Sequence, residues 1–192
     1  MCRSVGRIVA LWRDANFLSV DDKTQTIEID TSDFVEVKYP GPKVRPVPTF
    51  SIDIPPHWVI SEYPGSLFAM GTPATSRDPW SNVIVQHDRV LPNTALEQVA
   101  ILSWQDLKAE SPDAVVKDEQ MLLFELYHYV REVELSVQGV TEKVTRFDSF
   151  VFGPDVDHVT VDLFHFTWTH PVAAGDERTA LYLHILSTLH FQ

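Results

Sequence analysis

The second half of the chain alternates hydrophobic and polar residues, a period of two that is typical of β-strands. Turn-forming residues separate the segments, so we predict an antiparallel meander. The hydrophobic phase slips near Val130, where we expect a bulge or bend within one long strand. Four segments carry the pattern: Met121–Val137, Val140–Phe152, His158–His170 and Thr179–Phe191.

One helix is predicted between the strands. Thr94 and Glu97 have the spacing of a capping box, and Ser111 precedes a proline that ends the helix. Two shorter strands, Ser66–Met70 and Asn82–Val90, come before this helix. The residues that recur at helical spacing, and so predict one buried side, are Leu96, Ala100, Ser103, Trp104 and Leu107.

The first 48 residues are predicted to elaborate the same domain that residues 49–192 form. They are expected to contain a helix at Ser4–Leu18, a hairpin of Thr24–Asp30 and Phe34–Tyr39, and an extended proline-rich connector at Pro40–Pro48.

The segment Thr49–Ile60, TFSIDIPPHWVI, joins the two parts. Its alternating hydrophobic residues predict a short strand, and Pro55 and Pro56 interrupt it because they remove two backbone donors. The strand, the diproline and the following Trp58 resemble the opening of the Mog1/PsbP-like superfamily, in particular its LpqN-type members from actinobacteria. The order of elements continues the resemblance to about Leu189. No lipobox precedes this segment, unlike in the family's lipoprotein members.

This resemblance implies an α+β fold, an antiparallel β-sheet flanked by helices in an α/β/α sandwich. Members of the superfamily act as small-GTPase partners, photosystem accessory subunits and cell-envelope lipoproteins. No shared functional motif carries any of these roles to particular residues of this chain.

Composition bears mainly on the class of partner. At 192 residues the chain has the length of one domain. Its net charge of −12 argues against a nucleic-acid partner, because binding a phosphate backbone requires clustered Lys and Arg. The single cysteine, Cys2, allows no disulfide within the chain and no cysteine-based metal site.

The hydrophobic run Val5–Trp12 is short and interrupted by Arg7, so we predict neither a signal peptide nor a membrane span. The expected compartment is the cytoplasm, or outside it if the sequence lacks its natural N-terminus.

No motif for a nucleophile, a phosphate-binding loop or a dinucleotide appears, so no catalytic or cofactor-binding residue and no cofactor is predicted. His158, Asp162 and His170 share one face of a predicted strand. They would lie about 13 Å and about 26 Å apart along it, too far for one metal ion. We therefore predict no metal site.

Two surfaces are candidates for binding. Trp and Arg often anchor interfaces, which favours an interaction surface made of His57, Arg77, Asp78 and Trp80. The polar face of the last predicted strand would line a groove through Tyr182, His184 and His190. The structural alternatives are that Trp80 caps the core and that the strand face is merely solvated.

Two functions remain open from the sequence. The first is a non-enzymatic accessory module that engages an unidentified protein partner, and the second is a small-ligand carrier or enzyme with an aromatic, histidine-lined pocket between sheet and helix. A closed core would favour the first, and a deep cavity with His184 or His165 beside a carboxylate would favour the second. Homodimerisation through an exposed strand edge is a third, structural alternative.

Overall fold

The computed structural model describes residues 46–73, 80–137, 139–154 and 159–192. Nearly all of them belong to one compact unit, Val47–Gln192. The predicted N-terminal helix, the hairpin and most of the proline-rich connector lie outside the described residues.

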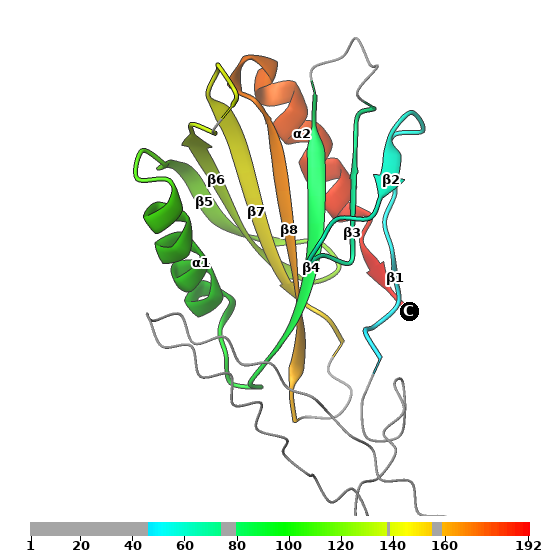
Figure 1. Cartoon of the computed structure of the whole chain (residues 1–192). Helices are drawn as coiled ribbons and strands as arrows, with labels where there is room; N and C mark the ends of the chain where they lie inside the picture. Colours follow the sequence, from blue (N-terminus) through cyan, green and yellow to red (C-terminus); the bar gives the residue numbers. More distant parts are fainter. Residues whose placement is uncertain (1–45, 74–79, 138, 155–158) are drawn as a thin grey trace, which may run out of the picture. The chain divides into compact units, whose positions relative to one another are not determined.

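The described residues form one large antiparallel sheet of seven strands, in the order β2-β3-β4-β8-β7-β6-β5 (Figure 1). The α+β fold with a large antiparallel sheet is therefore confirmed. The strands are β2 (Val59–Ser61), β3 (Phe68–Gly71), β4 (Asn82–Val90), β5 (Val115–Leu123), β6 (Tyr127–Leu135), β7 (Val144–Phe152) and β8 (Val161–Pro171).

Two α-helices within the described residues pack against opposite faces of this sheet, α1 (Leu96–Glu110) and α2 (Gly175–Ser187) (Figure 1). A 3-10 turn, η1 (Val172–Ala174), leads into α2. In the part of the chain described here, no helix is both long and apolar enough to span a bilayer.

The helix α1 was predicted correctly, but its start was not. The predicted capping box of Thr94 and Glu97 is displaced by one residue, because Ala95 precedes the first helical turn. Gln98, three residues later, accepts a hydrogen bond from the Ala95 amide at 3.2 Å. A glutamine therefore provides the side-chain part of the cap that the sequence assigned to a glutamate.

The single strand predicted at Met121–Val137 is wrong, because β5 and β6 are separate strands paired with each other. The chain turns between them at Phe124, whose amide donates to the carbonyl of Leu126 at 3.1 Å. The register irregularity lies in β5, between Val116 and Asp118, and not at Val130. Hydrophobic residues on both sides of Glu125 concealed the boundary.

The strand predicted at Thr179–Phe191 is also wrong, because most of this segment is the helix α2. The run is so rich in apolar residues that it fits periods of 2 and 3.6 about equally well, and packing decided between them. The buried positions have the helical spacing i, i+3, i+4 and i+7, at Tyr182, Ile185, Leu186 and Leu189.

Within the segment Thr49–Ile60, only its last residues, in β2, belong to the main sheet. Its first strand, β1 (Phe50–Ser51), pairs with β9 (His190–Phe191) at the end of the chain, as a separate two-stranded sheet. The predicted diproline break is a turn, in which the Trp58 amide donates to the Pro55 carbonyl at 2.9 Å.

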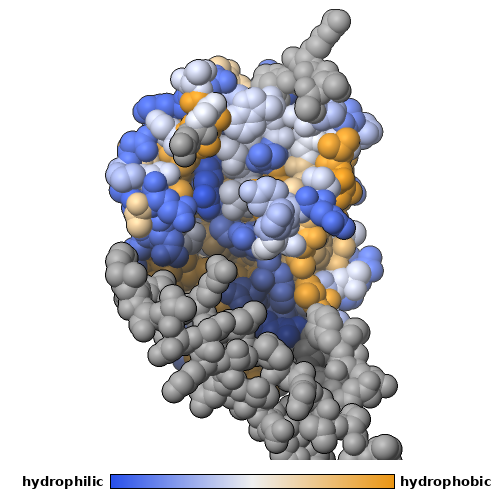
Figure 2. Space-filling model, in the orientation of Figure 1, coloured by the Kyte–Doolittle hydropathy of each residue, from blue (hydrophilic) through white to orange (hydrophobic). Residues whose placement is uncertain are grey.

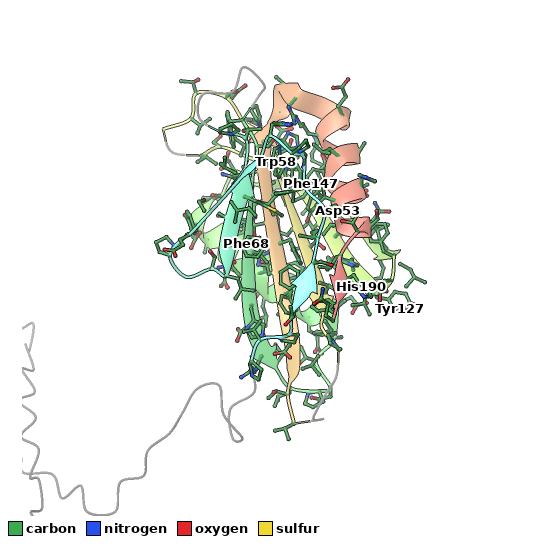
Figure 3. All side chains as sticks on the ribbon, turned by 90° about the vertical axis from the view of Figure 1, so that its right-hand side faces the viewer. Asp53, Trp58, Phe68, Tyr127, Phe147 and His190 are labelled. Carbon is green, nitrogen blue, oxygen red and sulfur yellow. The ribbon has the colours of Figure 1, made fainter. Side chains whose placement is uncertain are left out.

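The main hydrophobic core lies between the sheet and α2. Trp58 and Phe147 lie close together in it (Figure 3), and Trp168 and Tyr182 have ring centroids 4.7 Å apart. Two buried histidines, His128 and His170, adjoin this core. The Nδ1 of His128 lies 3.1 Å from the Ser149 hydroxyl. Burial lowers the pKa of His128 from 6.5 to about 4.

Replacing Leu186 with Ala should lower the free energy of unfolding by about 2–5 kcal/mol, because Leu186 lies on the side of α2 that is fully buried. The matched control is Leu183→Ala in the same helix, where the half-buried side chain should cost clearly less. Urea denaturation measures both. An equal or larger loss for Leu183→Ala would instead favour the strand that the sequence predicted.

The pKa of His128 makes the fold sensitive to acid. Between pH 6.5 and about 4 the unfolded chain protonates this histidine and the folded chain does not, so stability should fall as pH drops through this range. The effect is at most about 3 kcal/mol. Urea denaturation at pH 7 and pH 4.5 should show a smaller loss for His128→Asn than for the native chain. Equal losses would contradict this assignment.

Candidate functional site

A groove of about 700 Å³ lies between α1 and the sheet. The helix packs over β6 and β7, so the neighbouring strands β8 and β4 extend the floor beside it (Figure 1). Seen from the α1 side, hydrophilic residues cover the middle of this face, and hydrophobic residues gather at the edge where β2 and β3 lie (Figure 2). Hydrophilic residues therefore dominate the surface around the groove.

Residues of α1 that recur at helical spacing form one wall of the groove. Val99 and Leu102 make the wall apolar towards the N-terminal end of α1, and Asp106 and Glu110 make it acidic towards the other end. Ser103 lies between these two parts. The wall thus offers a ligand both hydrophobic surface and carboxylates.

Alternation along β7 and β8 creates the floor. On β8, Phe164 and Phe166 enter the core under α2, so His165 between them takes the opposite face, towards the groove. On β7, Phe150 lies directly opposite His165 in the strand register and shares its face. The same strands therefore build an aromatic core on one side and a mixed polar floor on the other.

Asp148 lies beneath the floor, between Arg146 and Phe150 along β7, and is almost completely buried. Its carboxylate accepts hydrogen bonds from Arg146 Nε at 3.0 Å and Arg146 Nη2 at 2.8 Å. His165 Nε2 lies 2.7 Å from the same oxygen, and the Thr167 hydroxyl donates to it at 3.2 Å. One buried acid thus fixes two side chains that reach the groove.

Asp148 is ionised in this setting. Burial by itself would raise the pKa of Asp148, but the hydrogen bond from His165 and the charge of Arg146 outweigh burial and hold this pKa at about 2. Removing one partner of such a buried ion pair is costly, since the remaining charge is left uncompensated.

The orientation of His165 is fixed by packing as well as by its hydrogen bond. Its ring stacks on Phe150 with centroids 4.3 Å apart and an angle of 18° between the planes. Its side chain is 16% exposed and that of Arg146 is 22% exposed, whereas that of Asp148 is 2% exposed. The side chains of Arg146 and His165 therefore reach the groove, and the carboxylate of Asp148 does not.

The position of α1 over the sheet depends on Arg131 of β6. Its Nη1 donates to the carbonyl of Ala100 in α1 at 2.7 Å, and its guanidinium lies 5.5 Å from the centroid of Trp104. Its Nε donates to Glu119 of β5 at 3.1 Å. This buried arginine fixes the helical wall at a set distance from the floor.

A second histidine–aspartate pair belongs to the other face of the sheet. His87 Nε2 lies 2.8 Å from Asp162 Oδ1, and Arg89 donates to the same oxygen at 3.1 Å. The ring of His87 lies 5.2 Å from that of Phe164, in the core under α2. This pair closes the end of that core.

The predicted interaction surface is only partly described. His57 and Trp80 are both exposed, and they lie near the same end of β2, β3 and β4. Arg77 and Asp78 lie outside the described residues. Trp58, between these positions, is buried in the core.

The residues of the predicted groove face are not brought together on one strand face, because the segment that bears two of them is helical. Tyr182 is buried against Trp168, and His184 is exposed on α2. His190 of β9 lies 2.7 Å from Glu125 in an exposed pair.

Sequence reasoning missed Arg146, Asp148 and Phe150 as site residues. The signal was present in VTRFDSFVF, where two charged residues on one face of an apolar strand require partners on the neighbouring strand. Among the described residues, no three His, Cys, Asp or Glu side chains converge to hold a metal ion. His158 of the rejected metal set lies outside them.

Comparison with solved structures identifies a similar fold. LpqN, described as involved in cell envelope biogenesis of Mycobacterium tuberculosis, matches with a TM-score of 0.60 and 11% identity over 76% of this chain and 84% of LpqN. PA94 of Pseudomonas aeruginosa, a protein of unknown function, matches with a TM-score of 0.49 and 8% identity over 69% of this chain and 95% of PA94. Neither protein-family models nor curated proteins match the chain. The likeness to LpqN concerns the fold.

Proposed function

We propose that this chain is a non-enzymatic binding module that takes a small amphipathic molecule into the groove beside α1. The observation that carries this proposal is the groove itself, a recess of about 700 Å³ with apolar sides and a polar floor fixed by the buried Asp148. Ligand sites of this size, largely apolar with a few placed polar groups, are typical of small-molecule binding.

Asp148 itself is not placed to act as a general base on a molecule in the groove. A general base must approach the proton that it removes. Asp148 is covered by hydrogen bonds from Arg146, His165 and Thr167 and cannot reach a molecule in the groove. Asp148 instead holds the side chains of Arg146 and His165 in place.

We further propose that the chain is a distant member of the Mog1/PsbP-like superfamily. The diproline turn before Trp58, the antiparallel sheet between two helices and the fold similarity to LpqN support this assignment. An accessory role is consistent with the activities known in that superfamily.

The groove is tested with N-phenyl-1-naphthylamine, an uncharged probe whose fluorescence rises in an apolar site. Leu102→Glu should weaken probe binding about tenfold, because it replaces apolar contact worth about 1.4 kcal/mol with a charge. The matched control is Ile101→Glu, since Ile101 is 53% exposed and Leu102 62%, and only Leu102 lines the groove. Equal affinities for the two variants would contradict the proposal.

A second candidate function is docking of a protein partner at the edge strand β2. Ile60 is 67% exposed there, and Val59 beside it is also exposed. An apolar edge strand can accept a strand from another protein. His57 and Trp80 lie near the same end of the sheet and would extend this surface.

Affinity capture from the lysate of the source organism tests this second candidate. The native chain should retain a protein that Ile60→Lys loses, because a lysine at the edge opposes strand addition. Ile101→Lys on α1 is the control and should retain the same protein. Identical captures by all three baits would exclude docking at β2.

A further inference from the structure

Two atoms of the groove floor have no hydrogen bond to any described residue. Arg146 uses Nε and Nη2 for Asp148, which leaves Nη1. His165 uses Nε2 for Asp148 and Thr167, which leaves Nδ1. Both side chains line the groove and both are partly exposed. These two nitrogens are therefore polar atoms that the floor offers to a ligand, beside the amide of Gln86, which lies opposite His165 on β4.

The buried carboxylate determines what each nitrogen offers. Asp148 is ionised and can only accept, so His165 Nε2 must carry the proton between them. In the neutral imidazole, Nδ1 then bears a lone pair and accepts a hydrogen bond. Arg146 Nη1 always donates. With a neutral His165, Asp148 thus orients one donor and one acceptor towards the groove.

The charges around the groove disfavour an anionic ligand. The positive charge of Arg146 is balanced by Asp148, and that of Arg89, which also lines the groove, is balanced by Asp162, which leaves the floor close to neutral. Asp88, Asp106 and Glu110 add carboxylates to the lining, and Asp106 and Glu110 form no ion pair with described residues. An anionic headgroup would be repelled by these carboxylates. A neutral group with both donors and acceptors fits the pair on the floor.

We propose that Arg146 and His165 form the headgroup subsite of the groove and select an amphipathic molecule whose head is uncharged and bears hydroxyl or amide groups. This inference rests on the proposed binding function and specifies its ligand class. A hydroxyl or amide both accepts from Arg146 Nη1 and donates to His165 Nδ1. The apolar part of the molecule lies against Val99, Leu102 and Leu163.

Three probes with the same eight-carbon tail test the head. Calorimetric titration is performed below the micelle concentration with octyl glucoside, octanoate and octyltrimethylammonium. Octyl glucoside should bind at least tenfold more tightly than either charged probe. Its affinity should fall about 3- to 10-fold in His165→Phe and in Arg146→Lys, since each removes one hydrogen bond to the head.

The variants are chosen so that Asp148 keeps partners. His165→Phe preserves the stacking on Phe150 and leaves Arg146 and Thr167 bound to Asp148. Arg146→Lys keeps the balancing charge and loses the groove-facing donor. The control is His184→Phe, because the His184 side chain is exposed on α2 and does not line the groove. This variant should bind like the native chain. Thermal denaturation verifies that each variant is folded.

Each outcome separates the two proposals. If the charged probes bind as tightly as octyl glucoside, or if the folded Arg146→Lys and His165→Phe variants bind it unchanged, the headgroup inference is wrong while groove binding stands. Tighter binding of the cationic probe would assign the site to the carboxylates of α1 instead. If none of the probes binds and Leu102→Glu has no effect on the naphthylamine, the proposed function fails as well.

Discussion

The alternation of side chains along β7 and β8 is the constraint on which the rest of the structure depends. A residue of these central strands that faces away from the aromatic core under α2 faces α1 or the groove beside it. Phe164 and Phe166 therefore determine the direction of His165, and Phe147 determines that of Arg146 and Asp148. The core and the candidate site are two faces of the same strands.

This arrangement places a charged side chain, Asp148, in the protein interior. An aspartate in the interior is unfavourable unless it is paired and fully hydrogen-bonded, and Asp148 meets both conditions through Arg146, His165 and Thr167. An apolar residue of similar size would pack there without such partners. The charge of Asp148 contributes what an apolar residue could not, because it fixes the directions of the Arg146 and His165 side chains at the groove.

The groove and the edge strand β2 divide the surface by chemistry. The groove combines apolar sides, a balanced floor and an acidic wall, which suits a small molecule with distinct polar and apolar ends. The edge at Val59 and Ile60 exposes apolar side chains on the outermost strand of the sheet that the described residues form, which suits a strand from another protein. Arg131 holds α1 above the sheet and so keeps the helical wall of the groove in position.

The sheet-rich α+β class, the helix α1, the strand β4 and the diproline turn can all be predicted from the sequence, because local periodicity and proline chemistry specify such elements. The helical form of the last apolar run, α2, and the pairing of β1 with β9 depend on contacts between distant residues, so they follow from the folded structure and not from local pattern. The same holds for the site. The alternation in β7 and β8 was legible, but the register that sets Phe150 opposite His165 and Asp148 opposite Thr167 is a non-local pairing that no local pattern specifies.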